Sequence, residues 1–161
     1  MKKKSKQQKY LEQYVGLKVE VDILQEELEW MQKEEGISSS SWNSDGSIWA
    51  KTTTGDKLGV KVIRKEEEIR RLEEKISAKK DLMLEIVQAI ERVPNPMQRS
   101  VLRRRYINCE KGRLTVWNDV ALSIYKNDDA NDVQSAHRLH GRALQSIAPI
   151  IDRIEKEKSH P

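Results

Sequence analysis

Two stretches of the chain carry apolar residues in a seven-residue repeat. In residues 5–35 and again in residues 60–93 the apolar positions recur at steps of three and four, with Lys65 and Lys79 at two positions of the second repeat. This spacing puts the apolar side chains on one stripe of an α-helix and is typical of helices that pair lengthwise. The apolar positions are Tyr10, Tyr14, Leu17, Val21, Leu24, Leu28 and Met31, then Val62, Ile69, Leu72, Ile76, Met83, Ile86, Ile90 and Val93. The pattern predicts a long antiparallel coiled-coil hairpin, and pairing of two hairpins would give a homodimer.

The segment that joins these helices, residues 36–58, is rich in Ser, Thr, Gly and Asp, which predicts a loop. Gly36 is placed to end the first helix. The loop contains Trp42 and Trp49, and two interpretations of them stay open. They can fold back and cap the adjacent helices, or they can form a protein contact site, because tryptophan is enriched at binding hot spots.

The sequence RVPNPMQ interrupts the second long helix. Pro94 ends it, Asn95 can cap the next helix, and Pro96 fits a first helical turn. We therefore expect one domain over residues 1–93 and a second over residues 94–161. The second contains four short amphipathic patterns, the last beginning after Pro149. Their expected inward residues are Met97, Val101, Leu102 and Tyr106; Trp117, Val120, Ala121 and Ile124; Val133, Ala136, Leu139, His140 and Ala143; and Ile150, Ile151 and Ile154.

The segments between the short helices of the second domain contain residues that predict turns and helix caps. Gly112 predicts a turn before the second short helix, and Thr115 is placed to cap that helix. Two short helices, a tight connection and a third helix with small inward residues form the pattern of a helix-turn-helix. Ala121 is the small residue that would let the two helices approach closely.

The third short helix, DVQSAHRLHGRAL, has a polar face made almost entirely of hydrogen-bond donors. Major-groove base edges present mostly acceptors on purines, so these side chains suit DNA bases, and arginines suit phosphates. Gly141 permits close packing or close backbone approach. The candidate DNA-binding residues are Gln134, Ser135, His137, Arg138 and Arg142 on this helix, with Arg103, Arg104 and Arg105 on the first short helix.

The amino-acid composition excludes several classes of protein function. The 161-residue chain has a net charge of +4, and the excess of basic residues falls after residue 98, where a polyanion would bind first. The single cysteine, Cys109, excludes an internal disulfide and a cysteine-rich zinc site. No apolar run approaches the roughly 20 residues that span a bilayer. We expect a cytosolic protein, with no cofactor and no membrane partner. Without a recognisable catalytic set, we expect no enzyme.

The motifs VLRRRYI, LTVWNDVA and HRLHGRAL resemble the C-terminal module of the RinA/ArpU-like late-gene activators of bacteriophages, which is similar to region 4 of bacterial sigma factors. The resemblance covers residues 90–148. In the N-terminal half only the helical hairpin pattern is shared with the family, without a matching motif. The resemblance implies an all-α fold and a recognition helix within DVQSAHRLHGRAL. It also implies a transcription activator in the bacterial host cytoplasm that binds promoter double-stranded DNA and contacts RNA polymerase or a partner protein. The turn at residues 126–131 is longer than in that family and brings Asp128, Asp129 and Asp132 near the DNA, and Val116 is an added residue.

Other functions stay open beside transcription regulation. A phage terminase small subunit also joins a helix-turn-helix to a helical oligomerisation region, and a coiled-coil scaffold protein would use its C-terminal helices to bind protein. His137 and His140 stand three residues apart, as half of a metal site would, but a zinc site needs three or four ligands. We expect no metal, and we expect His140 to be a packing residue with a hydrogen bond.

Overall fold

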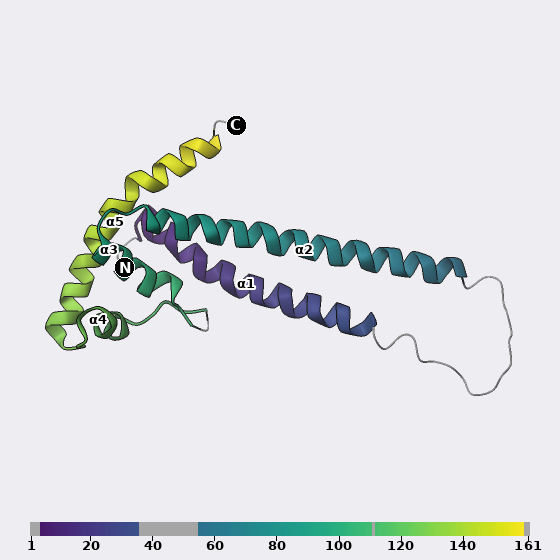
Figure 1. Cartoon of the computed structure of the whole chain (residues 1–161), viewed down its shortest axis with the longest axis horizontal. Helices are drawn as coiled ribbons and strands as arrows, with labels where there is room; N and C mark the ends of the chain where they lie inside the picture. Colours follow the sequence, from purple (N-terminus) through teal and green to yellow (C-terminus); the bar gives the residue numbers. More distant parts are fainter. Residues whose placement is uncertain (1–3, 36–54, 111, 160–161) are drawn as a thin grey trace. The chain divides into compact units, whose positions relative to one another are not determined.

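The computed structural model describes residues 4–35, 55–110 and 112–159, with the backbone alone at residues 34–35 and 55–62. The described residues form six helical elements, shown in Figure 1, and their only strand-like pairing is an isolated bridge between Glu110 and Arg113. The expected all-α class is therefore confirmed for this part of the chain. The elements are α1 (Lys6–Glu35), α2 (Gly55–Glu91), α3 (Pro96–Leu102), the π-helical turn η1 (Arg103–Ile107), α4 (Trp117–Tyr125) and α5 (Ala130–Ser159).

The long helices agree closely with the repeat that predicted them. α1 was expected from residue 5 to residue 35 and runs from Lys6 to Glu35. α2 begins at Gly55, five residues before the expected start, and ends at Glu91. Residues 55–58 were assigned to the loop with the Ser-, Thr-, Gly- and Asp-rich residues before them, but Leu58 stands four residues before Val62 and extends the apolar spacing backwards by one helical turn. Gly36, Trp42 and Trp49 lie outside the described residues.

The chain divides into two compact units that differ from the expected domains. The first, which we call the core unit, comprises Met1–Glu20 together with Lys80–Pro161, and the second, the two-helix unit, comprises Val21–Lys79. The division does not fall at residue 94, because Leu11 of α1 and Ile86 and Ile90 of α2 are buried in the same cluster as the C-terminal helices. The beginning of α1 and the end of α2 thus belong to the core unit.

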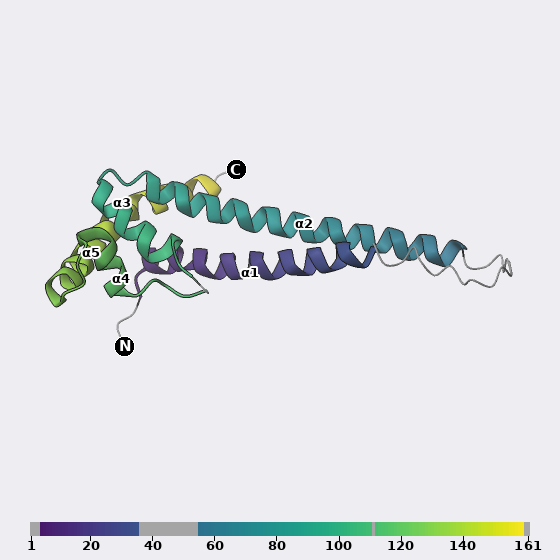
Figure 2. The same ribbon diagram turned by 60° about the horizontal axis from the view of Figure 1, so that its bottom comes forward.

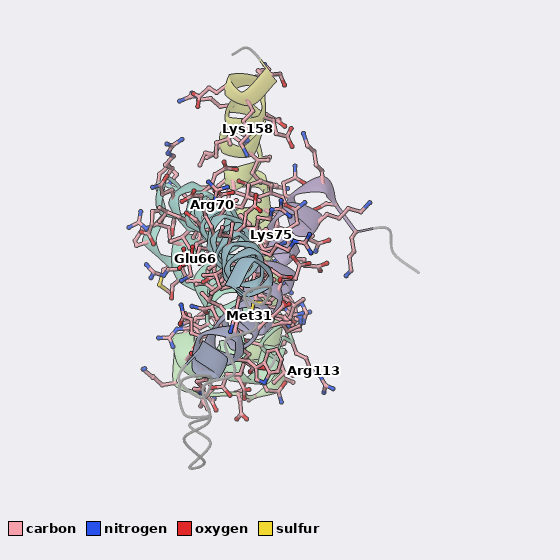
Figure 3. The ribbon with its side chains drawn as sticks, turned by 90° about the vertical axis from the view of Figure 1, so that its right-hand side faces the viewer. Met31, Glu66, Arg70, Lys75, Arg113 and Lys158 are labelled. Atoms are coloured by element: carbon pink, nitrogen blue, oxygen red, sulfur yellow. The ribbon has the colours of Figure 1, made fainter. Side chains whose placement is uncertain are left out.

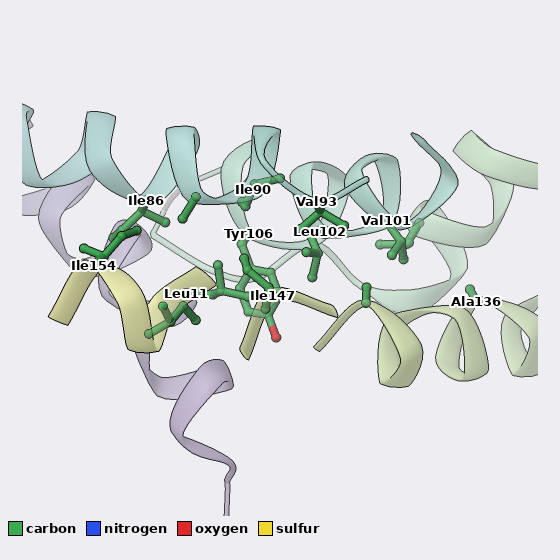
Figure 4. Packing of buried hydrophobic residues seen from close by; sticks show 14 of the residues in the cluster. Leu11, Ile86, Ile90, Val93, Val101, Leu102, Tyr106, Ala136, Ile147 and Ile154 are labelled. Carbon is green, nitrogen blue, oxygen red and sulfur yellow. The ribbon is translucent and has the colours of Figure 1, made fainter. Parts of the chain in front are cut away.

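The core unit is organised around a cluster of apolar side chains from all of its helices. Figure 4 shows side chains of α1, α2 and α3 meeting those of α5 around Tyr106. Ten of the fully or nearly fully buried members are Leu11, Ile86, Ile90, Val93, Val101, Leu102, Tyr106, Ala136, Ile147 and Ile154. Met97 was expected to face inward but is 44% exposed. It lies in the first turn of α3, where the neighbouring cap holds the backbone at the surface.

Local signals set the ends of the short helices. Asn95 caps α3 as expected, since its Oδ1 accepts hydrogen bonds from the backbone N–H groups of Met97 at 2.9 Å and Gln98 at 3.2 Å. Thr115 does not cap α4. The residue before that helix is Val116, and the Thr115 hydroxyl instead donates to the carbonyl of Asn108 at 3.4 Å.

The third and fourth short helices are one continuous helix. α5 contains Pro149, which was expected to separate them. Proline removes one backbone N–H from the helical hydrogen bonds. Here it sits on the exposed side, while Ile147 and Ile151 on either side of it are 0% and 1% exposed and fix both halves of the helix in the core. Burial of these two side chains compensates for the missing bond.

The two-helix unit has few buried side chains among its described residues. Segments of α1 and α2 lie side by side in it, as Figures 1 and 2 agree, and Val21, Leu72 and Ile76 are its buried side chains among the described residues. Glu66, Arg70 and Lys75 extend from α2 into solvent in Figure 3. No helix among the described residues has the length and apolar character needed to cross a membrane.

Candidate nucleic-acid interface

The first half of α5 has one buried face and one polar face, as its sequence predicted. Ala136, Ala143 and His140 are buried, and Leu139 and Val133 are half-buried. Opposite them, the side chains that were expected to meet DNA are accessible. Gln134, His137, Arg138 and Arg142 are exposed, and Ser135 is half-buried.

Two arginines on this face have no partner within the described part of the chain. Neither Arg138 nor Arg142 forms a hydrogen bond or an ion pair with another described residue, and both are exposed. Gly141 lies beside them, and a Cβ built on it would have no other atom within 4 Å. Gly141 therefore does not serve close helix packing inside the molecule. Its backbone is open to approach from outside, and the exposed guanidinium groups of Arg138 and Arg142 on the same helix can bind an anion.

His137 is engaged in a different contact from the one the sequence suggested. Its ring stacks on the Trp117 indole, with 4.0 Å between the ring centroids and an interplanar angle of 35°. Burial, followed by the charge of Arg105, lowers the pKa of His137. The neutral imidazole thus joins α5 to the first residue of α4. This contact makes His137 a positioning residue for α5.

His140 is buried beneath the same face. It is 6% exposed, and its Nε2 shares a hydrogen bond of 2.9 Å with the Tyr106 hydroxyl. Burial, followed by the charges of Arg105 and His137, lowers the pKa of His140 to about 4. Burial also raises the pKa of Tyr106 to about 12, so both groups are neutral near pH 7. The expectation that His140 is a packing residue with a hydrogen bond is confirmed.

The three arginines that end the first short helix have three different environments. Arg103 pairs with Glu91. The guanidinium of Arg105 donates to the carbonyl of Thr115 and stands 4.6 Å from the centroid of the Trp117 ring, and burial lowers its pKa. Arg104 is exposed and has no partner among the described residues. Of these three, Arg104 is the one with its full charge available to a phosphate.

The π-helical turn η1 directs neighbouring side chains of residues 103–107 to different places, one into the core and one toward α4. The backbone N–H of Asn108 donates to the carbonyl of Arg103 at 2.9 Å, a bond that spans five residues and marks a wide turn. Within this turn Tyr106 enters the core, and its neighbour Arg105 reaches Trp117. Apolar spacing did not predict this π turn, because a π turn differs from an α-helical turn by a single residue.

Arg113 is a further candidate that the sequence analysis missed. It is exposed and, with Arg104, lines a hollow of about 390 Å³. Gly112, with a φ of 67°, turns the chain just before it. The predicted turn at Gly112 could have indicated Arg113, because the side chain that follows this turn is exposed. Two carboxylates, Glu110 and Asp119, line the same hollow and reduce its positive potential.

The acidic turn before α5 has a structural role. Asp129 Oδ1 accepts a hydrogen bond from the backbone N–H of Asp132 at 2.9 Å, and its Oδ2 accepts one from the Asn127 side chain at 3.0 Å. Asp129 thus caps the helix that carries the candidate interface. α4 ends at Tyr125, and the cap residue after it, Lys126, has a left-handed backbone with a φ of 63°.

Comparisons of the chain with family models, with curated proteins and with solved structures find no match. Within the described ranges, no three or more His, Cys, Asp and Glu side chains gather in a way that could hold a metal ion. The geometry of this face and the motifs it contains are therefore the features that bear on function.

Proposed function

We propose that the chain is a DNA-binding transcription regulator in which α4 and α5 form a helix-turn-helix and α5 is the recognition helix. The observation that carries this proposal is the exposed face of α5, where Arg138 and Arg142 flank an open Gly141 opposite the buried Ala136 and Ala143. Donor-rich side chains on a rigidly packed helix are what major-groove readout needs.

The geometry supports distinct roles along the helix. In helix-turn-helix proteins the N-terminal part of the recognition helix contacts base edges. Gln134, Ser135 and Arg138 stand in that part and are the proposed base readers, whereas Arg142, one turn later, and Arg104 are the proposed phosphate contacts. His137, by stacking on Trp117, orients the helix and does not read bases.

The proposal also includes the DNA target, the mode of activation and the role of the long helices. The resemblance to the phage late-gene activators favours promoter DNA as the target and activation by contact with RNA polymerase. The long helices would form the antiparallel hairpin, which can dimerise or present the polymerase-contacting surface. Buried Ala121 on α4 and Ala136 on α5 are the small residues that such a helix-turn-helix uses for close approach.

The test compares Arg138→Ala with Arg142→Ala on specific and scrambled duplexes at several salt concentrations. Arg138→Ala should cost about 1–3 kcal/mol on the specific site and relax the preference at one base pair. Arg142→Ala should weaken binding to all sequences about equally and lower the salt slope by about one unit. Arg70→Ala in α2 removes the same charge from an exposed position and is the matched control.

Two outcomes would contradict the proposal: one contradicts the register of α5 on DNA, and the other contradicts DNA binding itself. If Arg138→Ala weakens all duplexes equally, Arg138 is a phosphate contact and the proposed register of α5 is wrong. If the unmodified chain binds no duplex even at low salt, α5 faces a protein, and the scaffold alternative replaces DNA binding. Assembly into a closed ring of many copies would favour the packaging alternative.

A further inference from the structure

One side of α1 in the two-helix unit exposes large apolar side chains away from the paired seam. Ile23 is 57% exposed and Trp30 is 61% exposed. They stand seven residues apart, so they share one stripe of the helix, and Glu26 lies on that stripe between them. Val21 and Leu28 lie on the opposite side and are buried and half-buried. α1 therefore has two apolar faces, of which one has no partner among the described residues.

The charges that α1 itself carries beside this outer face are mostly negative, although Glu27 also lines a hollow with Arg64, Arg71 and Lys75 of α2. Residues 22–33 contain four carboxylates and one lysine, Lys33, and that lysine pairs with Glu29 at 3.9 Å. All four carboxylates are exposed: Asp22, Glu26, Glu27 and Glu29. An exposed tryptophan beside an isoleucine, inside an acidic rim, combines the apolar anchor and the electrostatic steering of a protein-binding surface.

We propose that this outer face of α1 binds a basic amphipathic helix of a partner protein. Apolar side chains of such a helix would cover Trp30 and Ile23, and its lysines and arginines would pair with the acidic rim. This surface is distinct from the DNA-binding face proposed on α5, and the inference does not depend on DNA binding.

Charge distinguishes this occupant from the others available. Nucleic acid would bring phosphates against four carboxylates. A second copy paired through the same face would bring the same four carboxylates together. Residues 36–54 of this chain contain one aspartate and one lysine, so they supply no positive excess. A basic helix is the occupant that satisfies both the apolar stripe and its rim.

The probe for the test is a designed peptide of about 20 residues, long enough to form a helix, with leucines on one side and lysines and arginines flanking them. A second peptide keeps the leucines and replaces every basic residue with glutamate. Both carry fluorescein, and anisotropy is measured with the full chain. The basic peptide should bind, its affinity should fall as salt rises, and the acidic peptide should bind at least about tenfold more weakly.

Variants then locate the binding surface. Trp30→Ala should weaken binding of the basic peptide by about tenfold or more, because it removes the anchor of the stripe. Glu26→Lys combined with Glu27→Lys should weaken it similarly and remove the salt dependence. Leu122→Ala is the matched control, since Leu122 is 48% exposed on α4, and it should leave binding unchanged. Because Trp30 is exposed, its truncation should leave the helical circular dichroism intact.

Three results would overturn the inference. The first is equal binding of both peptides, and the second is unchanged binding by Trp30→Ala. The third is a sedimentation experiment in which the unmodified chain is a dimer and Trp30→Ala a monomer, which assigns the face to a second copy. Duplex titration of Trp30→Ala should match the unmodified chain, so that failure here and failure of the proposed DNA binding are distinguishable.

Discussion

The core unit and the two-helix unit are both helical where the structure describes them, yet their described residues bury apolar side chains to very different extents. In the core unit, side chains such as Leu102, Val120 and Ile147 are fully buried among several helices. In the two-helix unit, Val21, Leu72 and Ile76 are the buried side chains that the structure describes, and Leu28 remains half-buried. Stability scales with the apolar area removed from water. The exposed face of α5 is therefore carried by the unit whose described residues are the more deeply buried.

The largest expected effect tests this contrast directly. Ile147→Ala in the core unit removes a side chain with no exposed area and should lower the free energy of unfolding by about 2–5 kcal/mol. Leu28→Ala in the two-helix unit removes a half-buried side chain and should cost about 1 kcal/mol. Guanidinium unfolding followed by circular dichroism measures both. Equal losses would show that the two-helix unit depends on burial as much as the core unit does.

The next largest expected effect is a dependence of the free energy of unfolding on pH, through His140 in the core unit. Burial holds the pKa of His140 at about 4 in the folded chain, below the ordinary value of 6.5 that it regains on unfolding. The unfolded chain therefore binds the proton first as the pH falls. The stability that neutral His140 contributes is complete above pH 6.5 and should be lost progressively down to about pH 4, by about 3 kcal/mol.

The matched variant for this pH dependence is His140→Gln, which keeps a polar group near the Tyr106 hydroxyl but cannot titrate. Unfolding free energies measured between about pH 7 and pH 5 should fall less steeply in the variant than in the unmodified chain. Carboxylates that titrate in the same range are common to both proteins, so the difference in slope isolates His140. Identical slopes would mean that His140 is protonated equally in both states.

Much of the local structure was predictable because it depends on short-range patterns. The repeat in residues 5–35 predicted α1 to within one residue, the Asn95–Pro96 pair predicted the start of α3, and the helical spacing predicted the buried Ala136 and Ala143 of α5. Each of these signals acts within a few residues of the chain, where helical periodicity and capping determine the outcome.

The features that escaped prediction depend on contacts between distant residues. Leu11 and Val15 are buried beside the heptad seam of α1. A pattern with one apolar stripe does not predict this second buried face, and the beginning of α1 belongs to the core unit. Arg105 and His137 had the residue types of DNA contacts, but Trp117 engages both of them. Nothing in the spacing of a single helix reveals which partner the fold will bring to it.

A smaller effect should follow from a turn in the core unit. Gly112 has a φ of 67°, and a Cβ there would lie 2.6 Å from Cγ2 of Val19. Gly112→Ala should destabilise the chain by about 1–2 kcal/mol, since the left-handed backbone disfavours alanine and the contact is too close. Combining it with Val19→Ala should recover the steric part of the loss and leave the backbone part. If the double variant recovers nothing, the whole cost lies in the backbone conformation.

The smallest effect tests whether charge, and not burial, distinguishes the two units. Arg71 and Glu67 pair at 3.5 Å in the two-helix unit with side-chain exposures of 67% and 50%, and Arg103 pairs with Glu91 in the core unit at 49% and 45%. Exposed pairs contribute little because water and salt screen them, so Arg71→Ala and Arg103→Ala should each cost less than about 1 kcal/mol. Thermal unfolding at low and high salt measures both losses. Similar small losses in the two units would leave apolar burial as the source of their difference. A loss from Arg71→Ala comparable to that from Ile147→Ala would mean instead that the two-helix unit is held together by its charges.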